Sequence, residues 1–168
     1  MKEIGYEQAL QITAEHLSDG GVFLNVGGEA PNTMTIGWAT IGYIWKKPVF
    51  MALVRKQRHS HALIDAAGEF TVSVPTRNPL RSELIFAGTK SGRDYDKFSG
   101  HGITAVPAQK VGAPIIGECG LHFECRTLLT QDMDPAHMDP AIANGIYAAN
   151  DFHTMFFGEI LACYTTDE

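Results

Sequence analysis

The chain has 168 residues, of which 45% are hydrophobic and 19% charged, with 17 Gly and 8 Pro. This composition is ordinary for one globular domain with a sizeable core, and it excludes a disordered, collagen-like or coiled-coil chain. No apolar run approaches the roughly 18 residues that a membrane span needs, and the first residues lack the apolar stretch of a signal peptide. We therefore expect a cytoplasmic protein that does not bind a membrane.

The charged residues are unevenly distributed along the chain. The formal net charge is -6, which argues against nucleic acid as a partner, because phosphate backbones are bound by a surplus of basic residues. Between Lys46 and Lys97, however, ten basic residues stand against five acidic ones, so this segment carries +5 and the remainder -11. The basic central third suits a small anionic ligand, and a solvated basic surface is the alternative.

In chain order, the pattern of apolar residues predicts short helices among consecutive strands. Helices are indicated by apolar residues three and four positions apart, and strands by β-branched and aromatic runs between turn signals. The predicted elements of the first half are a helix over 6–17, strands over 22–26, 33–45 and 49–54, a helix over 59–67, a strand over 69–74 and a helix over 79–87. Gly68 and Gly88 are expected to end the last two helices.

The second half has fewer regular segments. Residues 89–102 are polar and Gly-rich, which predicts a surface loop with one helical turn over 95–98. Residues 132–150 contain two Asp-Pro pairs and predict a long departure from the sheet, which we call the excursion. Residues 153–164 then return as a strand that is apolar enough for burial on both faces.

The three cysteines are an odd number, so we expect reduced thiols rather than a disulfide framework. Residues 119–125 alternate in character, which predicts a half-buried strand with His122 and Glu124 on its outer face. Cys119 and Cys125 are six residues apart on this strand, which is too far for one tetrahedral zinc ion. No metal site is therefore expected.

The elements together favour a mainly β fold. Six or seven strands occur with two or three short helices, without the regular strand-helix alternation of a doubly wound parallel sheet. We therefore predict a closed, mostly antiparallel barrel with a few short peripheral helices, the first of them within residues 1–18. No repeat, linker or low-complexity segment divides the sequence, so one domain over residues 1–168 is expected.

Several familiar motifs are incomplete. Residues 88–91 read Gly-Thr-Lys-Ser, which lacks the Gly-Lys-Ser order of a nucleoside-triphosphate-binding loop. No Gly-x-Gly-x-x-Gly follows a strand, which argues against a dinucleotide bound on a Rossmann unit. The sequence also lacks the Gly-x-Ser-x-Gly elbow of a serine hydrolase.

Three clusters instead match the needs of a phosphorylated aromatic ligand. Such a ligand requires cations and oriented N–H donors for its phosphate, and a flat apolar wall for its ring. The clusters are Asn-Thr-Met-Thr at 32–35 with Trp38, Arg-Lys-Gln-Arg-His-Ser at 55–60, and Lys-Ser-Gly-Arg at 90–93. Ser60 is predicted to cap a helix that begins near His61, and a helix N-terminus preceded by an arginine is a ready anion site.

Seven short motifs occur in a fixed order along the chain. They are Asn-Thr-Met-Thr-Ile-Gly-Trp at 32–38, Lys-Pro-Val-Phe at 47–50, Arg-His-Ser-His at 58–61, Gly-Glu-Phe-Thr-Val at 68–72, Ser-Gly-Arg-Asp-Tyr-Asp-Lys-Phe at 91–98, Glu-Cys at 118–119 and again at 124–125, and His-Thr at 153–154 before Phe-Gly-Glu at 157–159. In this order and spacing they resemble the flavin reductase-like family, whose members bind FMN on a split barrel, and within it the flavoredoxin-like branch. The resemblance covers about residues 19–159.

The resemblance implies an antiparallel Greek-key split β-barrel that forms a homodimer, with FMN in a groove near the subunit interface. The implied cofactor-binding residues are Asn32, Thr33, Met34, Thr35, Trp38, Arg55, Arg58, His59, Ser60, Lys90, Ser91 and Arg93. Residues 32–35 and Trp38 would edge the isoalloxazine ring, and residues 58–60 would hold the phosphate and ribityl chain. Lys90, Ser91 and Arg93 would close over the anion. His153 is the implied catalytic residue, near the flavin face where a nicotinamide would stack.

Simpler roles exist for some of these residues. Trp38 could belong to the core, Arg93 could pair with acidic neighbours in its loop, and His153 could be a hydrogen-bonded strand residue. The chain also departs from the family at residues 56–59, where Lys-Gln-Arg-His replaces the frequent Pro-Ser-Arg-Tyr. A titratable imidazole at His59 could therefore make the affinity for the cofactor depend on pH.

Three functions follow from the resemblance. The first is an oxidoreductase in which NAD(P)H, a transient co-substrate, reduces FMN by hydride transfer to N5. The second is a flavoredoxin-type electron carrier that a redox protein partner reduces, and the third is a flavin-binding module without turnover. Anaerobic mixing with NADH or NADPH separates the first from the other two, because only a reductase bleaches the yellow flavin by itself.

Overall fold

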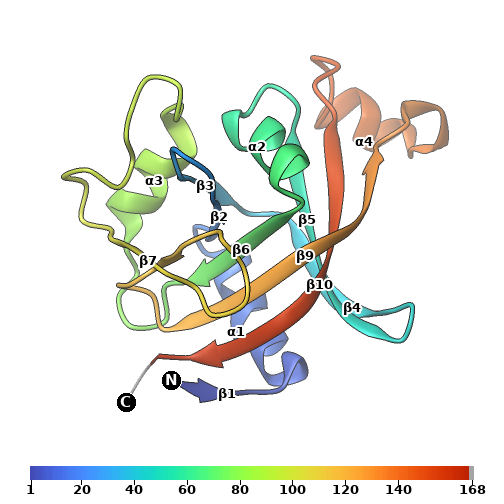
Figure 1. Ribbon diagram of the computed structural model, residues 1–168. Helices are drawn as coiled ribbons and strands as arrows, with labels where there is room; N and C mark the ends of the chain where they lie inside the picture. The colour runs from blue at the N-terminus through green and yellow to red at the C-terminus, as the bar shows by residue number, and fades with distance from the viewer. Residues whose placement is uncertain (167–168) are drawn as a thin grey trace.

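The computed structural model describes residues 1–166 and shows a mainly β fold with four short α-helices (Figure 1). In chain order the elements are β1 (Lys2–Glu3), α1 (Tyr6–Ser18), β2 (Val22–Val26), β3 (Asn32–Ile36), β4 (Ala39–Ile44), β5 (Lys47–Arg55), α2 (His59–Ala67), β6 (Glu69–Val74), α3 (Arg81–Thr89), β7 (Ala105–Val106), β8 (Ile115–Ile116), β9 (Leu121–Asp132), a 3-10 helix (Pro135–His137), α4 (Pro140–Gly145) and β10 (His153–Thr165). Among residues 1–166, no helix is long and apolar enough to cross a membrane.

One antiparallel sheet forms the body of the protein. Its strands follow the order β3-β2-β6-β9-β10-β5-β4, and β1 pairs with the C-terminal end of β10. The predicted antiparallel β fold with short peripheral helices is thus confirmed. Because β3 and β4 stand at the two ends of this order, the barrel is split between them, as the resemblance implied. The closed barrel predicted from the residue pattern alone was wrong.

The interior of the barrel is filled by large apolar side chains. The ring of Phe50 lies with its centroid 5.2 Å from that of Phe123 and 6.4 Å from that of Phe70. Each such buried side chain contributes about 1.5–3 kcal/mol relative to an exposed one. A Cβ at Gly158 would lie 2.7 Å from Cζ of Phe70, so the glycine on β10 allows this close packing. A second cluster around Phe23 holds α3 against the other face of β2.

The strand predicted over 33–45 is in fact two strands. The first strand, β3, pairs with β2 and ends at Ile36. After Gly37 and Trp38 the chain continues as β4, which pairs with β5 from Ala39 onward. One continuous periodic segment therefore serves the two opposite ends of the sheet. Alternation along the chain cannot reveal this, because it shows which face a side chain takes and not which strand lies beside it.

The helix α3 begins and ends two residues later than predicted, and Gly88 lies inside it rather than at its end. A Cβ at residue 88 would lie 3.3 Å from Cβ of Thr35, so this glycine allows α3 to approach β3 closely. Gly68, with a φ of 66°, does end α2 as predicted. In the loop after α3, turns and bends take the place of the helical turn predicted over 95–98.

The side chains of His122 and Glu124 on β9 are fully buried, so the outer position predicted for these two residues was wrong. Glu124 accepts hydrogen bonds from the backbone N–H groups of Gln109 and Lys110, at 2.8 and 2.5 Å. The loop that carries these two donors lies over Glu124. A buried carboxylate is tolerated there because hydrogen-bond donors replace the water that it loses. The cysteines among the described residues are free and buried, as predicted.

The excursion leaves the sheet between β9 and β10 as predicted (Figure 1). Its two Asp-Pro pairs begin the 3-10 helix and α4. The carboxylates of Asp134 and Asp139 each accept a hydrogen bond at 2.8 Å from the backbone N–H two residues later, and proline follows at the first helical position. The excursion therefore has defined local structure of its own.

Candidate functional site

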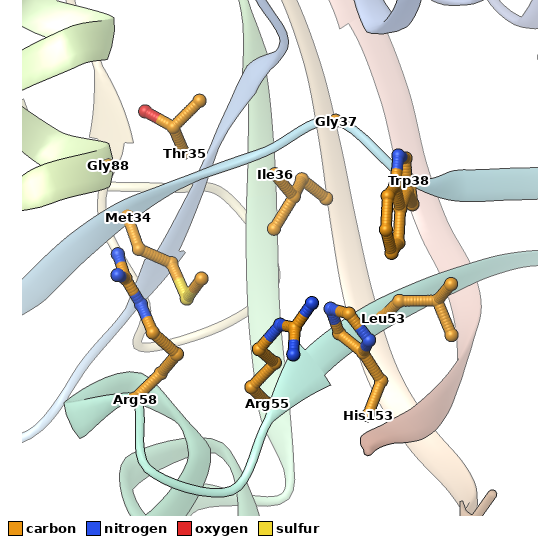
Figure 2. Close-up of a pocket in the computed structure, with 10 residues that line it drawn as sticks. All are labelled: Met34, Thr35, Ile36, Gly37, Trp38, Leu53, Arg55, Arg58, Gly88 and His153. Atoms are coloured by element: carbon orange, nitrogen blue, oxygen red, sulfur yellow. The ribbon is translucent and has the colours of Figure 1, made fainter. Parts of the chain in front are cut away.

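Two adjoining cavities lie beside the split of the barrel. The first has a volume of about 260 Å³ and the second of about 170 Å³, and they share Met34 and Arg58. The first is lined by Met34, Thr35, Ile36, Gly37, Trp38, Leu53, Arg55, Arg58, Gly88 and His153 (Figure 2). The second is lined by Asn32, Met34, Gln57, Arg58, His59, Ser60, Thr89, Lys90, Ser91, Gly92, Arg93 and Lys97. Together they reach the size typical of small-molecule sites.

Trp38 stands at the rim of the first cavity. Its side chain is 45% exposed, and its ring centroid lies 5.2 Å from that of His153 (Figure 2). The segment between β3 and β4 is held in place where the Trp38 carbonyl accepts a hydrogen bond from the backbone N–H of Leu53 at 3.4 Å. Trp38 is therefore a wall of the cavity and not a core residue.

His153, the first residue of β10, is a neutral imidazole at pH 7. It is 8% exposed, and its Nδ1 lies 2.7 Å from the hydroxyl of Tyr147. Burial, and after it the positive charge of Arg55, lower the pKa of His153 to about 4. The side chain is thus hydrogen-bonded, as the simpler alternative held, and it also lines the first cavity.

Arg55, at the end of β5, has an acidic partner. Its Nη1 donates hydrogen bonds to the backbone carbonyl of Asp151 at 2.6 Å and to the carboxylate of the same residue at 3.0 Å. The amide of Gln57 donates to that carboxylate as well. Arg55 therefore contributes a fixed and partly balanced positive charge to the first cavity.

The second cavity gathers five basic side chains, namely Arg58, His59, Lys90, Arg93 and Lys97. Lys97 is only 2% exposed, and its Nζ donates hydrogen bonds at 2.8 Å to the carbonyl oxygens of Thr33 and Ala87. Burial, and then the charge of Arg58, lower the pKa of Lys97 to about 8. Burial, followed by the charges of Arg93 and Lys97, also lowers the pKa of His59. In both cases burial disfavours the charged form, and the nearby positive charges disfavour it further.

The lysines and arginines of the second cavity form no ion pair with a carboxylate anywhere in residues 1–166. Arg58 donates a long hydrogen bond of 3.4 Å to the carbonyl of Ala87, and burial lowers its pKa. Like charges at close range repel, so an anion in this cavity would relieve the repulsion. The residues present therefore fit a phosphate group.

The N-terminus of α2 lies at the second cavity, although Ser60 does not cap it as predicted. The helix begins at His59, the first residue of its predicted range, with Arg58 at the N-cap position, whereas a cap at Ser60 required a start near His61. Ser60 therefore lies in the first turn, where its hydroxyl accepts a hydrogen bond from Nδ2 of Asn32 at 2.8 Å. Because the first backbone N–H groups of a helix have no partner within it, α2 still presents donors to an anion in this cavity.

Gly92 lets the loop after α3 close over the second cavity. A Cβ at this position would overlap the amide oxygen of Asn32 and lie 2.9 Å from Cδ2 of His59. Its neighbour Arg93 donates a hydrogen bond of 3.1 Å to the backbone carbonyl of Gln57. This bond stands in place of the suggested ion pair within the loop, and it ties the loop to the start of α2.

Twelve of the thirteen site residues predicted from the sequence line one of the two cavities. The exception is Thr33, whose side chain is fully buried and whose carbonyl accepts a hydrogen bond from Lys97. Sequence reasoning missed Lys97, although this lysine lies inside the motif at 91–98 that carried the resemblance. It also missed Tyr147 and Asp151, for which the excursion contained no signal. In residues 1–166, no group of three His, Cys, Asp or Glu residues is arranged to hold a metal ion.

The site thus consists of a cavity rich in basic side chains beside a second cavity that apolar, aromatic and basic side chains line together. The chain belongs to the flavin reductase-like family, because the flavin reductase like domain matches residues 17–168. An uncharacterized protein of Archaeoglobus fulgidus is 32% identical over 148 residues, which cover 88% of this chain and 73% of that protein. The resemblance stated from the motifs is therefore confirmed.

Solved structures show the same likeness. The flavoredoxin of Desulfovibrio vulgaris (Miyazaki F) is 27% identical, with a TM-score of 0.68 over 88% of this chain and 70% of that one. An FMN-binding protein from Thermus thermophilus is 20% identical, with a TM-score of 0.67 over 86% of this chain and 70% of that one. At the lower identity the likeness establishes the shared split-barrel fold.

Proposed function

We propose that the chain is an FMN-binding oxidoreductase that takes hydride from NAD(P)H. The observation that carries this proposal is the second cavity, where Arg58 and Lys97 lack acidic partners within residues 1–166. A ligand held there by a phosphate would extend into the first cavity, because the two cavities share lining residues. The flavoredoxin and the FMN-binding protein among the structural relatives support a flavin as that ligand.

The two cavities would bind different parts of FMN. Arg58, Lys97 and the first turn of α2 would hold the phosphate of FMN, because they offer charge and N–H donors in one place. Ile36 and Trp38 would contact its ring in the first cavity. The other cofactor-binding residues predicted from the sequence keep their proposed roles except Thr33, and residues 1–168 would form one FMN-binding domain.

Two residues of the first cavity would shape the reaction. Bound FMN supplies a ring that takes up hydride at N5, so the protein needs no nucleophile of its own. Arg55, fixed by Asp151, would stabilise negative charge on a ring bound in the first cavity. His153 stands with Trp38 at the rim over which a reduced nicotinamide would approach, which is the catalytic role proposed for it.

A second candidate function is that of an electron carrier. The likeness to the Desulfovibrio flavoredoxin, at 27% identity and a TM-score of 0.68, favours a chain that is reduced by another protein. The same cavities would hold FMN in this case. The two functions differ only in the source of electrons, a reduced nicotinamide or a redox protein partner.

The deciding experiment has two stages. FMN is first titrated into the purified protein, with quenching of flavin fluorescence as the signal, and we expect saturable binding. The FMN-loaded protein is then mixed anaerobically with NADH or NADPH, and we expect its visible absorbance to bleach. Colour that persists with both nicotinamides would contradict the reductase, and bleaching that requires a reduced protein would establish the carrier.

The homodimer and the cytoplasmic location belong to the same proposal. Tyr43 near the end of β4 and Trp45 in the turn that follows are 62% and 52% exposed. Leu128 and Leu129 on β9 are 38% and 40% exposed. Exposed apolar side chains in groups mark surfaces for association, and free buried thiols suit a reducing compartment. Sedimentation equilibrium should give the mass of two chains, and the mass of one chain would contradict the dimer.

A further inference from the structure

The excursion brings one tyrosine to the edge of the first cavity. Tyr147 is 3% exposed, although its neighbour Ile146 is 51% exposed. Its ring stacks on Phe152, with centroids 4.9 Å apart and planes at 26°, and the guanidinium of Arg55 lies 5.4 Å from its centroid. These contacts hold the ring in place, so the direction of its hydroxyl is fixed.

The hydroxyl of Tyr147 has two partners at once. Its Oη lies 2.7 Å from Nδ1 of His153 and 3.2 Å from Sδ of Met133. A phenol has one proton to donate, and a thioether sulfur can only accept. Both hydrogen bonds therefore form together only if the phenol donates to the sulfur and accepts from an N–H on Nδ1.

The neighbouring charge favours the same placement of the proton. Figure 2 shows the His153 ring beside the guanidinium of Arg55, with both side chains turned toward the cavity. A guanidinium is a donor only, so a ring nitrogen that faces it is more stable as a lone pair than as an N–H. The second ring nitrogen, Nε2, has no hydrogen-bond partner in residues 1–166. The imidazole is neutral at pH 7, so it carries a single ring proton.

We propose that Tyr147 is a positioning residue that holds His153 as the Nδ1–H tautomer, so that Nε2 accepts a hydrogen bond from a ligand in the first cavity. The matching group on the ligand is an N–H or O–H donor, such as a primary amide or a hydroxyl. A ketone in the same position lacks the required proton. The identity of the ligand rests on the proposed function, which makes the carboxamide of a reduced nicotinamide the expected donor.

The tautomer is tested without any flavin. The ring nitrogens of His153 are observed by NMR on the ¹⁵N-labelled protein at pH 7 and assigned with His153→Gln. We expect a protonated Nδ1 and a bare Nε2 in the wild type, and a shift of the proton toward Nε2 in Tyr147→Phe, which keeps the ring and removes only the hydroxyl. Tyr43→Phe, at a tyrosine that is 62% exposed, is the matched control and should leave the spectrum unchanged. The assignment would be overturned if the wild-type protein carried the His153 proton on Nε2. It would also be overturned if Tyr147→Phe kept the same tautomer as the wild type.

The ligand class is tested on the FMN-loaded protein. NADH is compared with its reduced 3-acetylpyridine analogue, in which a methyl ketone replaces the amide. We expect the wild type to have a KM for NADH about fivefold lower than for the analogue, and Tyr147→Phe to lose most of this preference. Equal KM values in the wild type would overturn the ligand class. No oxidation of NADH at all would overturn the proposed function together with the ligand class, whereas the NMR spectrum alone decides the tautomer.

Discussion

The two cavities differ in how the protein balances its own positive charge. In the first, Arg55 has an acidic partner, the carboxylate of Asp151 at 3.0 Å. In the second, Arg58 and Lys97 donate to backbone carbonyls instead, and the pKa of Lys97 falls to about 8. The charge of Arg55 in the first cavity is thus partly balanced without a ligand, whereas the charges of Arg58 and Lys97 have no carboxylate partner within residues 1–166. From this comparison we expect the affinity for an anionic ligand to come mainly from the second cavity, and the selectivity for its ring from the first.

The largest effect is expected from the arginine that both cavities share. Arg58→Ala removes a charged contact to the phosphate and should weaken FMN binding by about 1.5–3 kcal/mol, or roughly ten- to a hundredfold in Kd. Calorimetric titration with FMN measures this loss. Arg81→Ala is the matched control, because Arg81 is an exposed arginine on α3 that pairs with Asp19. An unchanged Kd in Arg58→Ala would contradict the phosphate assignment.

The affinity for FMN should also decline in alkaline solution. Below about pH 8 Lys97 is charged in the free protein, and a bound anion raises its pKa, so above pH 8 binding must be accompanied by proton uptake. We expect Kd to rise about tenfold between pH 7 and pH 9 in the wild type. Lys97→Arg should give a flatter profile, because arginine stays charged over this range. Identical profiles for the two proteins would show that Lys97 does not face the anion.

A smaller effect is expected from the wall of the first cavity. Trp38→Ala removes an aromatic contact to the ring and should weaken FMN and riboflavin equally, by about fivefold, since both ligands carry the same ring. Fluorescence titration with the two flavins measures the losses. Trp45→Ala, at the other tryptophan, which is 52% exposed, is the control. If Trp38→Ala weakened the binding of FMN but not of riboflavin, Trp38 would not contact the ring, and the proposed division of roles between the two cavities would be contradicted.

The smallest effect concerns the imidazole that departs from the family pattern. The pKa of His59 is lowered by burial and by Arg93 and Lys97, so the side chain is neutral at pH 7, and a bound phosphate would raise that pKa again. As the pH falls from 7 to 5.5, the wild type should gain about threefold in FMN affinity relative to His59→Tyr. Measuring both proteins at each pH cancels the titration of the phosphate itself. A ratio of Kd values that does not change with pH would exclude His59 from the site.

Much of the fold could be predicted because periodicity is a local property. The strand β2 and the helix α2 match their predicted bounds, and β10 extends one residue beyond its prediction. The split of the barrel was implied by the family resemblance, but periodicity alone could not predict it, because Gly37 and Trp38 interrupt the strand pairing without interrupting the alternation of side chains. The burial of Glu124 was missed for a related reason, since its partners are backbone donors on a separate loop.

The candidate site was predictable where its residues are close in sequence. Arg58, His59 and Ser60 follow one another, and they line one cavity together. Lys97 was missed because its burial depends on carbonyls of β3 and α3, which only the folded chain brings to its ammonium. Tyr147 was missed because its role depends on contacts with Arg55 at the end of β5 and His153 at the start of β10.

Paired titrations of the wild-type protein with FMN and with riboflavin test the central claim most directly, because the two flavins differ only in the phosphate. If the uncompensated cations of the second cavity hold that phosphate, FMN should bind at least about tenfold more tightly than riboflavin at pH 7. Equal affinities for the two flavins, or no saturable binding of FMN, would contradict it.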